Sequence, residues 1–246
     1  MSGERVTYPP LDVLKPVAEG LWIVDSGPLR MLGMKLPVRM TVIRLAGGDL
    51  LLHSPTRFDE GLRQAMQRLG RIRHLVAPNS AHWRHVGDWQ RRCPDAVTWA
   101  APGLRERGQV KRSGLRLDRD LAEAPPPDWA GEIEQMIVPG GIGFREVAFF
   151  HKPTHSLLLT DLVVNVEPGR LPPLMRLGAR LVGATAPDGR APVYLRLLVR
   201  MKRAEAARAA ARLVAWEPER VIFAHGRWFD RDGAAALRRS LAWLLS

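Results

Sequence analysis

Two histidines three residues apart, His82 and His85, follow directly on an apolar run that ends at Ala77. Residues 73–77 have the pattern of a buried strand, and the residues after them form a turn into a short helix. Imidazoles at such a turn can bind zinc, but a catalytic zinc site needs three protein ligands and groups that orient them. The pair therefore predicts part of a metal site, whose other ligands must come from elsewhere in the chain.

Two further candidates stand where predicted strands end. Asp161 follows the strand 156–160, and His225 follows the strand 220–224. Functional groups in α/β folds gather at such strand ends. The strands 146–150 and 156–160 form a predicted hairpin, which places His151 and His155 at its tip and Asp161 at the opposite end. We therefore expect Asp161 and His225 to lie near His82 and His85, away from the hairpin tip.

The elements that must position these groups alternate between strand and helix. Short apolar runs, helical spacing and turn signals predict a mostly α/β order, including a hairpin across residues 46–48 and a long surface excursion over residues 102–128. The predicted strands are 21–25, 40–45, 49–53, 73–77, 96–100, 134–138, 146–150, 156–160 and 220–224, and the predicted helices are 60–69, 87–92, 202–216 and 233–245.

The composition indicates one domain of 246 residues with a full core. No apolar run approaches the ~20 residues that a membrane span needs, and the first ten residues show no secretory signal, so we expect a cytoplasmic protein. Cys93 is the only cysteine, which excludes an internal disulfide and a cysteine cage for a metal.

The net charge of +12 is concentrated in one segment. Between residues 170 and 212, ten basic residues face only Asp188 and Glu205. Such a surface attracts nucleic acid, anionic lipid or an acidic substrate, unless its arginines are simply solvated. Because no base-reading motif accompanies the charge, we expect it to help bind an anion near the site, without sequence-specific nucleic-acid recognition.

The same segment suggests weak attachment to a membrane surface. Between residues 171 and 202, leucines alternate with arginines, as in interfacial helices. A helix that closes the pocket is the alternative. The residues concerned are Leu174, Leu177 and Leu181, with Arg176 and Arg180.

These residues, in this order, resemble the metallo-β-lactamase superfamily, and in particular a branch catalogued as a domain of unknown function. The resemblance covers nearly the whole chain. It implies an αββα sandwich, in which two mixed sheets are flanked by helices, formed by residues 1–246 as a single domain. The superfamily binds two metal ions through the pattern His-x-His-x-Asp-His, a later Gly-His-Thr histidine, a bridging aspartate and a final histidine.

Laid on this sequence with Gly87 as the anchor, the pattern is incomplete. Its first histidine falls on Ser80, its second on His82, its aspartate on Arg84 and its third histidine on His85. The Gly-His-Thr histidine falls on residues 139–141, which contain no ligand. The bridging aspartate matches Asp161 and the final histidine matches His225, so four of the seven ligand positions remain.

The resemblance implies that one metal position, which keeps only His82, is empty. The other keeps His85, Asp161 and His225, which could hold one zinc, iron or manganese ion with water in the fourth place. Arg84 stands where the family has a carboxylate, and its charge opposes metal binding while allowing an ion pair with Asp161.

Two hypotheses of function follow. The favoured one is a metal-free pocket that binds an anionic small molecule or partner without turnover, with Arg84 in place of the cation. The alternative is a mononuclear metal-dependent hydrolase that uses His85, Asp161 and His225, with His82 as a proton donor or as a group that orients a ligand. His53 occupies the place of an aspartate that is typical of the superfamily, and the sequence assigns it no role.

Overall fold

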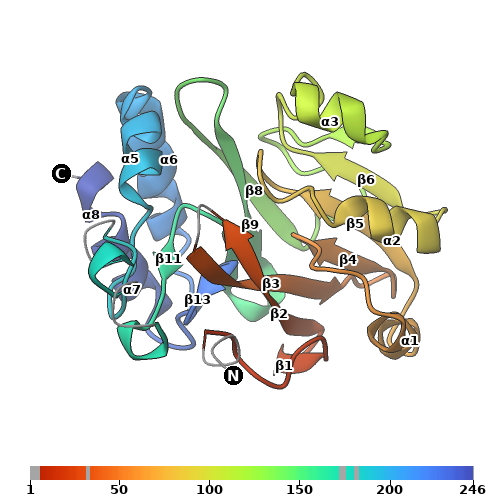
Figure 1. Cartoon of the computed structure of the whole chain (residues 1–246). Helices are drawn as coiled ribbons and strands as arrows, with labels where there is room; N and C mark the ends of the chain where they lie inside the picture. Colours follow the sequence, from red (N-terminus) through yellow and green to blue (C-terminus); the bar gives the residue numbers. More distant parts are fainter. Residues whose placement is uncertain (1–5, 32–33, 172–175, 180–182, 246) are drawn as a thin grey trace.

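The computed structural model describes residues 6–31, 34–171, 176–179 and 183–245. Two sheets face each other at the centre, with helices on both outer faces (Figure 1). Because both sheets contain parallel and antiparallel neighbours, they are mixed, and the predicted αββα sandwich is confirmed. Within the described residues, no helix has the length and apolarity that a membrane crossing requires.

The first sheet has seven strands in sequence order, from β1 to β7. Its first part is a set of antiparallel hairpins, and β4, β5, β6 and β7 run parallel to one another. The strands are β1 (Lys15–Ala18), β2 (Leu21–Met31), β3 (Met34–Arg44), β4 (Leu50–His53), β5 (Ile72–Ala77), β6 (Val97–Ala100) and β7 (Arg119–Asp120). Its outer face packs against α1 (Glu60–Gln67), α2 (Val86–Arg92) and α3 (Gly108–Ser113) through buried residues such as Met66, Trp89 and Val110.

The second sheet has four strands in the order β12, β10, β9, β8. Its strands are β8 (Ile133–Pro139), β9 (Arg145–His151), β10 (Ser156–Leu158) and β12 (Arg220–Ile222). Its outer face is covered by α5 (Val193–Arg200), α6 (Arg203–Ala215), α7 (Gly233–Ser240) and α8 (Ala242–Leu245). A separate parallel pair joins β11 (Val164–Asn165) to β13 (His225–Gly226).

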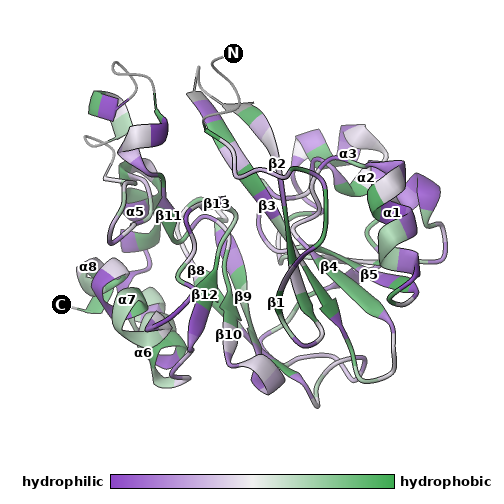
Figure 2. Ribbon diagram, turned by 90° about the horizontal axis from the view of Figure 1, so that it is seen from below, coloured by the Kyte–Doolittle hydropathy of each residue, from purple (hydrophilic) through white to green (hydrophobic). Residues whose placement is uncertain are grey.

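Apolar side chains on the inner faces of the two sheets form the central core. Strand residues alternate in direction, so each strand can contribute one set of side chains to this core and the other to the helices outside it. Figure 2 shows hydrophobic strands in the middle and mixed colouring on the helices, whose outer faces meet water. Buried central residues include Leu21, Ile43, Trp99, Phe149 and Ile222.

The predicted elements are found, with differences at their ends. The strands predicted at 156–160 and 220–224 stop at Leu158 and Ile222, because the chain then leaves the sheet toward the candidate site. The terminal helix is divided at Leu241, and the excursion 102–128 contains α3 and β7. Short 3-10 turns, Lys152–Thr154 and Pro168–Arg170, complete the order.

The hairpin tip lies where the sequence predicted. His151 ends β9, and His155 follows the 3-10 turn in a left-handed conformation. Neither residue belongs to the cavity described below. Of the leucines proposed for surface attachment, Leu174 and Leu181 lie outside the described residues, while Leu177 is exposed in a helical stretch at 176–179.

Candidate metal centre

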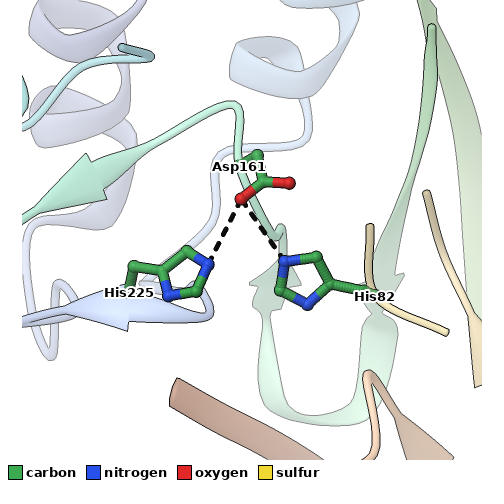
Figure 3. Close-up of side chains that lie close together, drawn as sticks. All are labelled: His82, Asp161 and His225. Carbon is green, nitrogen blue, oxygen red and sulfur yellow. Dashed lines mark hydrogen bonds and ion pairs between the residues drawn. The ribbon is translucent and has the colours of Figure 1, made fainter. Parts of the chain in front are cut away.

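Three side chains from distant parts of the sequence meet at one carboxylate oxygen. Nε2 of His82 and Nε2 of His225 each lie 3.3 Å from Oδ1 of Asp161. Figure 3 shows both rings directed at this oxygen from opposite sides. One ligand atom from each residue lies within 4.8 Å of the other two.

Asn79 positions His82. Its Oδ1 accepts hydrogen bonds from the backbone N–H groups of Ala81, at 2.8 Å, and His82, at 2.9 Å. This local turn begins just after β5 and aims the His82 ring at the second sheet. Nδ1 of His82 lies 2.6 Å from the hydroxyl of Ser54, which follows β4. The ring is therefore held at both ends.

A fully buried carboxylate, Glu146, positions Asp161. It accepts the backbone N–H groups of Thr160 at 2.7 Å, Asp161 at 2.8 Å and Leu162 at 3.1 Å. The amide of Asn79 also donates to Oδ2 of Asp161 at 2.7 Å. Because Oδ2 is already bonded in this way, Oδ1 remains for the two histidines.

His225 is oriented by a backbone carbonyl. Its Nδ1 lies 2.8 Å from the oxygen of Pro37. A carbonyl can only accept, so Nδ1 carries the hydrogen, and the neutral ring presents the lone pair of Nε2 to the site. Metal-binding histidines typically have this arrangement. The next residue, Gly226, has a φ of +95°, and a Cβ there would overlap the carbonyl of Asn165.

Arg39 supports the backbone on both sides of His225. Its guanidinium donates to the carbonyls of Phe223 at 3.0 Å and Gly226 at 2.8 Å. The same group forms a buried ion pair of 2.6 Å with Asp25, which also pairs with Lys15 at 2.7 Å. The paired charge offsets the cost of burying the guanidinium.

The protonation states of Asp161 and His225 depend on each other. Burial would raise the pKa of Asp161, but the neighbouring His82 and His225 hold it well below its usual value. Burial would lower the pKa of His225, but its contacts with Asp161 and Pro37 raise it above its usual value. A proton or another cation is therefore stabilised between these groups.

All five predicted site residues line one cavity of about 250 Å³ at the strand ends. Apolar walls surround it, including Leu29, Val38, Pro55, Phe144, Leu195 and Leu198. The charged and titratable lining groups are Arg39, His82, Arg84, His85, Asp161, Tyr194 and His225. We call it the strand-end cavity, and its polar groups gather in an otherwise apolar recess.

His85 and Arg84 line this cavity without joining the central group. His85 precedes α2, and its ring lies outside the cluster of His82, Asp161 and His225. Burial lowers the pKa of His85, so the ring is neutral near pH 7. Arg84 is exposed.

The predicted ion pair between Arg84 and Asp161 is wrong. Among the described ion pairs, Asp161 is matched with the two histidines, and Arg84 has no acidic partner. The reason is geometric, because Asn79 and the histidines already surround both carboxylate oxygens. Arg84 lines the cavity and is exposed, so its charge is in contact with water.

Tyr194 is a site residue that the sequence did not indicate. It projects from α5 into the cavity wall, and burial together with the charge of Asp161 raises its pKa to about 12. The phenol is therefore a neutral hydrogen-bond donor near pH 7. The sequence also did not indicate Glu146, Asn79 and Arg39, because each acts through contacts between distant parts of the chain. Of these three, only Asn79 has a local signal, since it is a polar residue two positions after the end of the buried strand β5.

His53 is a buried neutral residue beside the site. Its ring packs 5.2 Å from that of Phe149, and the side chain is almost inaccessible. Burial, with a smaller effect of His82, lowers its pKa to about 3. It therefore supports the core behind Ser54 and His82 as an uncharged group.

The central group has the dimensions of a metal site. Ligand atoms 2.0–2.2 Å from a tetrahedral zinc ion lie about 3.3–3.6 Å from each other. Both Nε2–Oδ1 distances are 3.3 Å, whereas a charge-assisted hydrogen bond is typically about 2.7–2.9 Å. The second nitrogen of each histidine and the second oxygen of Asp161 are held by hydrogen bonds. The two remaining nitrogens and Oδ1 are therefore free to bind one metal ion, and their distances fit that role.

Solved structures define the class of fold. A metallo-β-lactamase from Pontibacter korlensis aligns with a TM-score of 0.63 at 14% identity, over 94% of this chain and 97% of that one. The metallo-β-lactamase FIM-1 from Pseudomonas aeruginosa, solved in its mono-zinc form, aligns with a TM-score of 0.59 at 15% identity, over 95% and 96% of the two chains. At these identities the likeness shows the metallo-β-lactamase fold.

The family is defined by sequence. Residues 19–189 match the family described as a domain of unknown function, DUF4336. Since this match spans more than half of the chain, the protein belongs to that family. A search of curated proteins found no significant match.

Proposed function

We propose that this protein binds one divalent metal ion through His82, Asp161 and His225 and hydrolyses a small substrate that carries an anionic group. The 3.3 Å spacing of both imidazole nitrogens from one carboxylate oxygen carries this proposal. Two histidines and one carboxylate suit zinc, iron or manganese. The ligand set thus uses His82 where the family alignment favoured His85.

The chemistry follows from the groups around the cavity. A metal ion in a three-ligand site acts as a Lewis acid and lowers the pKa of a water molecule. His85, neutral and at the cavity wall, can accept a proton. Tyr194 can donate a hydrogen bond to a substrate oxygen, and Arg84 can bind the substrate's anionic group.

The apolar wall of the cavity supports a substrate that is partly apolar. Leu29, Val38 and Leu195 offer no hydrogen bonds, so they favour hydrocarbon next to the polar cluster. Glu146 and Asn79 keep Asp161 in place during the reaction, since their contacts fix its backbone and its second oxygen.

The second candidate is the metal-free anion-binding pocket. Its support is the raised pKa of His225, because a proton on that ring can neutralise Asp161 without a metal. The exposed Arg84 would then attract an anionic ligand that is bound and not converted.

Metal analysis with a matched variant distinguishes the two candidates. We expect protein purified without chelator to contain about one metal ion, and Asp161→Asn, which keeps the size of the side chain but removes its charge, to contain none. Hydrolysis of small carboxylate-bearing esters and phosphodiesters should disappear in the same variant. A wild-type protein that takes up no zinc, iron or manganese would reject the enzyme proposal, and binding of these anions without turnover would support the second candidate.

A further inference from the structure

Exposed apolar side chains gather at one place on the surface. The described residues include eight large hydrophobic side chains that are exposed, and five of these lie on α5 or directly beside it. The five are Ile142, Val193, Tyr194, Leu197 and Met201, and together they are called the α5 patch. Single exposed apolar residues are ordinary, but such a cluster marks a contact surface.

The α5 patch is continuous although its members come from two elements. The N–H of Gly141, in the turn between β8 and β9, donates to the carbonyl of Leu198 at 2.7 Å. Met201 packs so tightly on Gly141 that a Cβ there would overlap it. Figure 1 shows the β8–β9 hairpin ending beside α5. Ile142 at the tip of this turn therefore shares a surface with Leu197.

Ile142 is the most exposed of these residues, with 81% of its surface accessible. Its φ is +53°, a conformation that disfavours β-branched residues strongly. Neither exposure nor backbone conformation explains an isoleucine at this position, since glycine or asparagine would fit better. Backbone strain of this kind is retained where the side chain has a function.

The charge around the patch is mainly positive. Residues 189–204 contain five basic residues and no acidic one. Next to the turn, an open recess of about 670 Å³ lies between β8 and α6. Four basic residues line it, with Glu123 and Glu205: Arg145, Lys202, Arg208 and Arg212.

We infer that the α5 patch docks on an anionic lipid surface, with Ile142 inserted among the lipid chains and the surrounding basic residues against the headgroups. An apolar group with a cationic border is the pattern of interfacial binding. Tyr194 belongs to both the patch and the strand-end cavity, and Leu198 and Phe144 line that cavity beside it. The cavity mouth would thus face the lipid. This inference does not depend on the metal.

Vesicle sedimentation tests the inference with the whole protein. We expect binding to vesicles of phosphatidylcholine and phosphatidylglycerol in equal parts, and much weaker binding to phosphatidylcholine alone. Ile142→Asn should lower the partition coefficient by about tenfold or more, because a buried aliphatic side chain is removed. Asparagine tolerates positive φ, so this variant should fold as well as wild type or better. Arg200→Gln should lower anionic-vesicle binding by about fivefold and reduce its salt dependence.

The matched control is Val13→Asn, which changes another exposed β-branched residue outside the patch. It should bind vesicles like wild type. Equal binding by wild type and Ile142→Asn, or no wild-type binding to anionic vesicles, would overturn the inference. If wild type instead forms a dimer that Ile142→Asn dissociates, the patch is an interface with a second copy. The remaining possibility is that the patch binds an acidic protein. In that case wild type would not bind vesicles.

Discussion

Replacing each of two neighbouring histidines in turn distinguishes the proposed ligand set of His82, Asp161 and His225 from the set with His85 that the family resemblance implied. His82→Ala removes an imidazole whose Nε2 lies 3.3 Å from Oδ1 of Asp161. His85→Ala removes an imidazole that lines the same cavity but lies outside the ligand group. The His85 side chain makes no capping hydrogen bond to α2, so its loss leaves the helix intact.

The expected difference is large. Loss of a group that merely orients a ligand costs about 10–100-fold in metal affinity, so loss of one of three ligands should cost at least about 100-fold. This corresponds to about 2.7 kcal/mol of binding free energy. At a zinc concentration about 100 times the Kd, wild type should gain about 2.7 kcal/mol of stability, or roughly 5–10 °C in Tm.

Isothermal calorimetry on chelator-treated protein, with thermal melts in the presence and absence of zinc, measures both quantities. Wild type and His85→Ala should bind zinc within a fewfold of each other and show the same thermal shift. His82→Ala should show neither the affinity nor the shift. Loss of zinc binding in His85→Ala, with binding retained in His82→Ala, would refute the assignment.

Three further predictions follow from the same geometry. Since Arg84 is exposed and has no ion-pair partner among the described residues, Arg84→Ala should change the free energy of unfolding by less than about 0.5 kcal/mol, and denaturant unfolding that shows strong destabilisation would contradict this. Arg84→Asp should raise zinc affinity, measured by calorimetry, because it removes a cation from the cavity. His53 and His151, whose pKa values burial lowers to about 3 and about 4, bind protons more readily when unfolded. Stability should therefore fall as the pH drops below about 6.5, by about 2 kcal/mol for each histidine at pH 5, and urea unfolding that is unchanged between pH 7 and pH 5 would argue against this. Glu146→Gln should cost about 2–4 kcal/mol and weaken metal binding, because an amide group would replace one acceptor for the N–H groups of Asp161 and Leu162; a variant with wild-type stability and affinity would show that Glu146 does not position the site.

Much of the architecture could be predicted from local sequence. Short apolar runs, such as residues 21–24 in β2 and residues 147–150 in β9, predict buried strands, and this signal does not depend on distant residues. The order of the motifs further indicated the metallo-β-lactamase fold and a site at the strand ends. The two mixed sheets confirm the fold, and all five candidate residues line one cavity.

The internal arrangement of the site was decided only by tertiary contacts. Asn79 directs its side chain across the sandwich to Asp161, and Glu146 binds the backbone of the same residue from the neighbouring strand. Asn79, in the turn that carries His82, is 82 positions from Asp161 in sequence and 67 positions from Glu146, whose carboxylate it also contacts at 3.4 Å.

The choice between ligands shows the same limit. The positions of His85 and Arg84 in the family motif favoured a ligand role for His85 and an ion pair between Arg84 and Asp161. The spacing of residues in a turn does not specify the directions of their side chains, however. Only the packed structure brings His82 and His225 to one oxygen of Asp161 and leaves Arg84 in water. Sequence thus determined which residues could do chemistry, whereas long-range hydrogen bonds determined which of them meet.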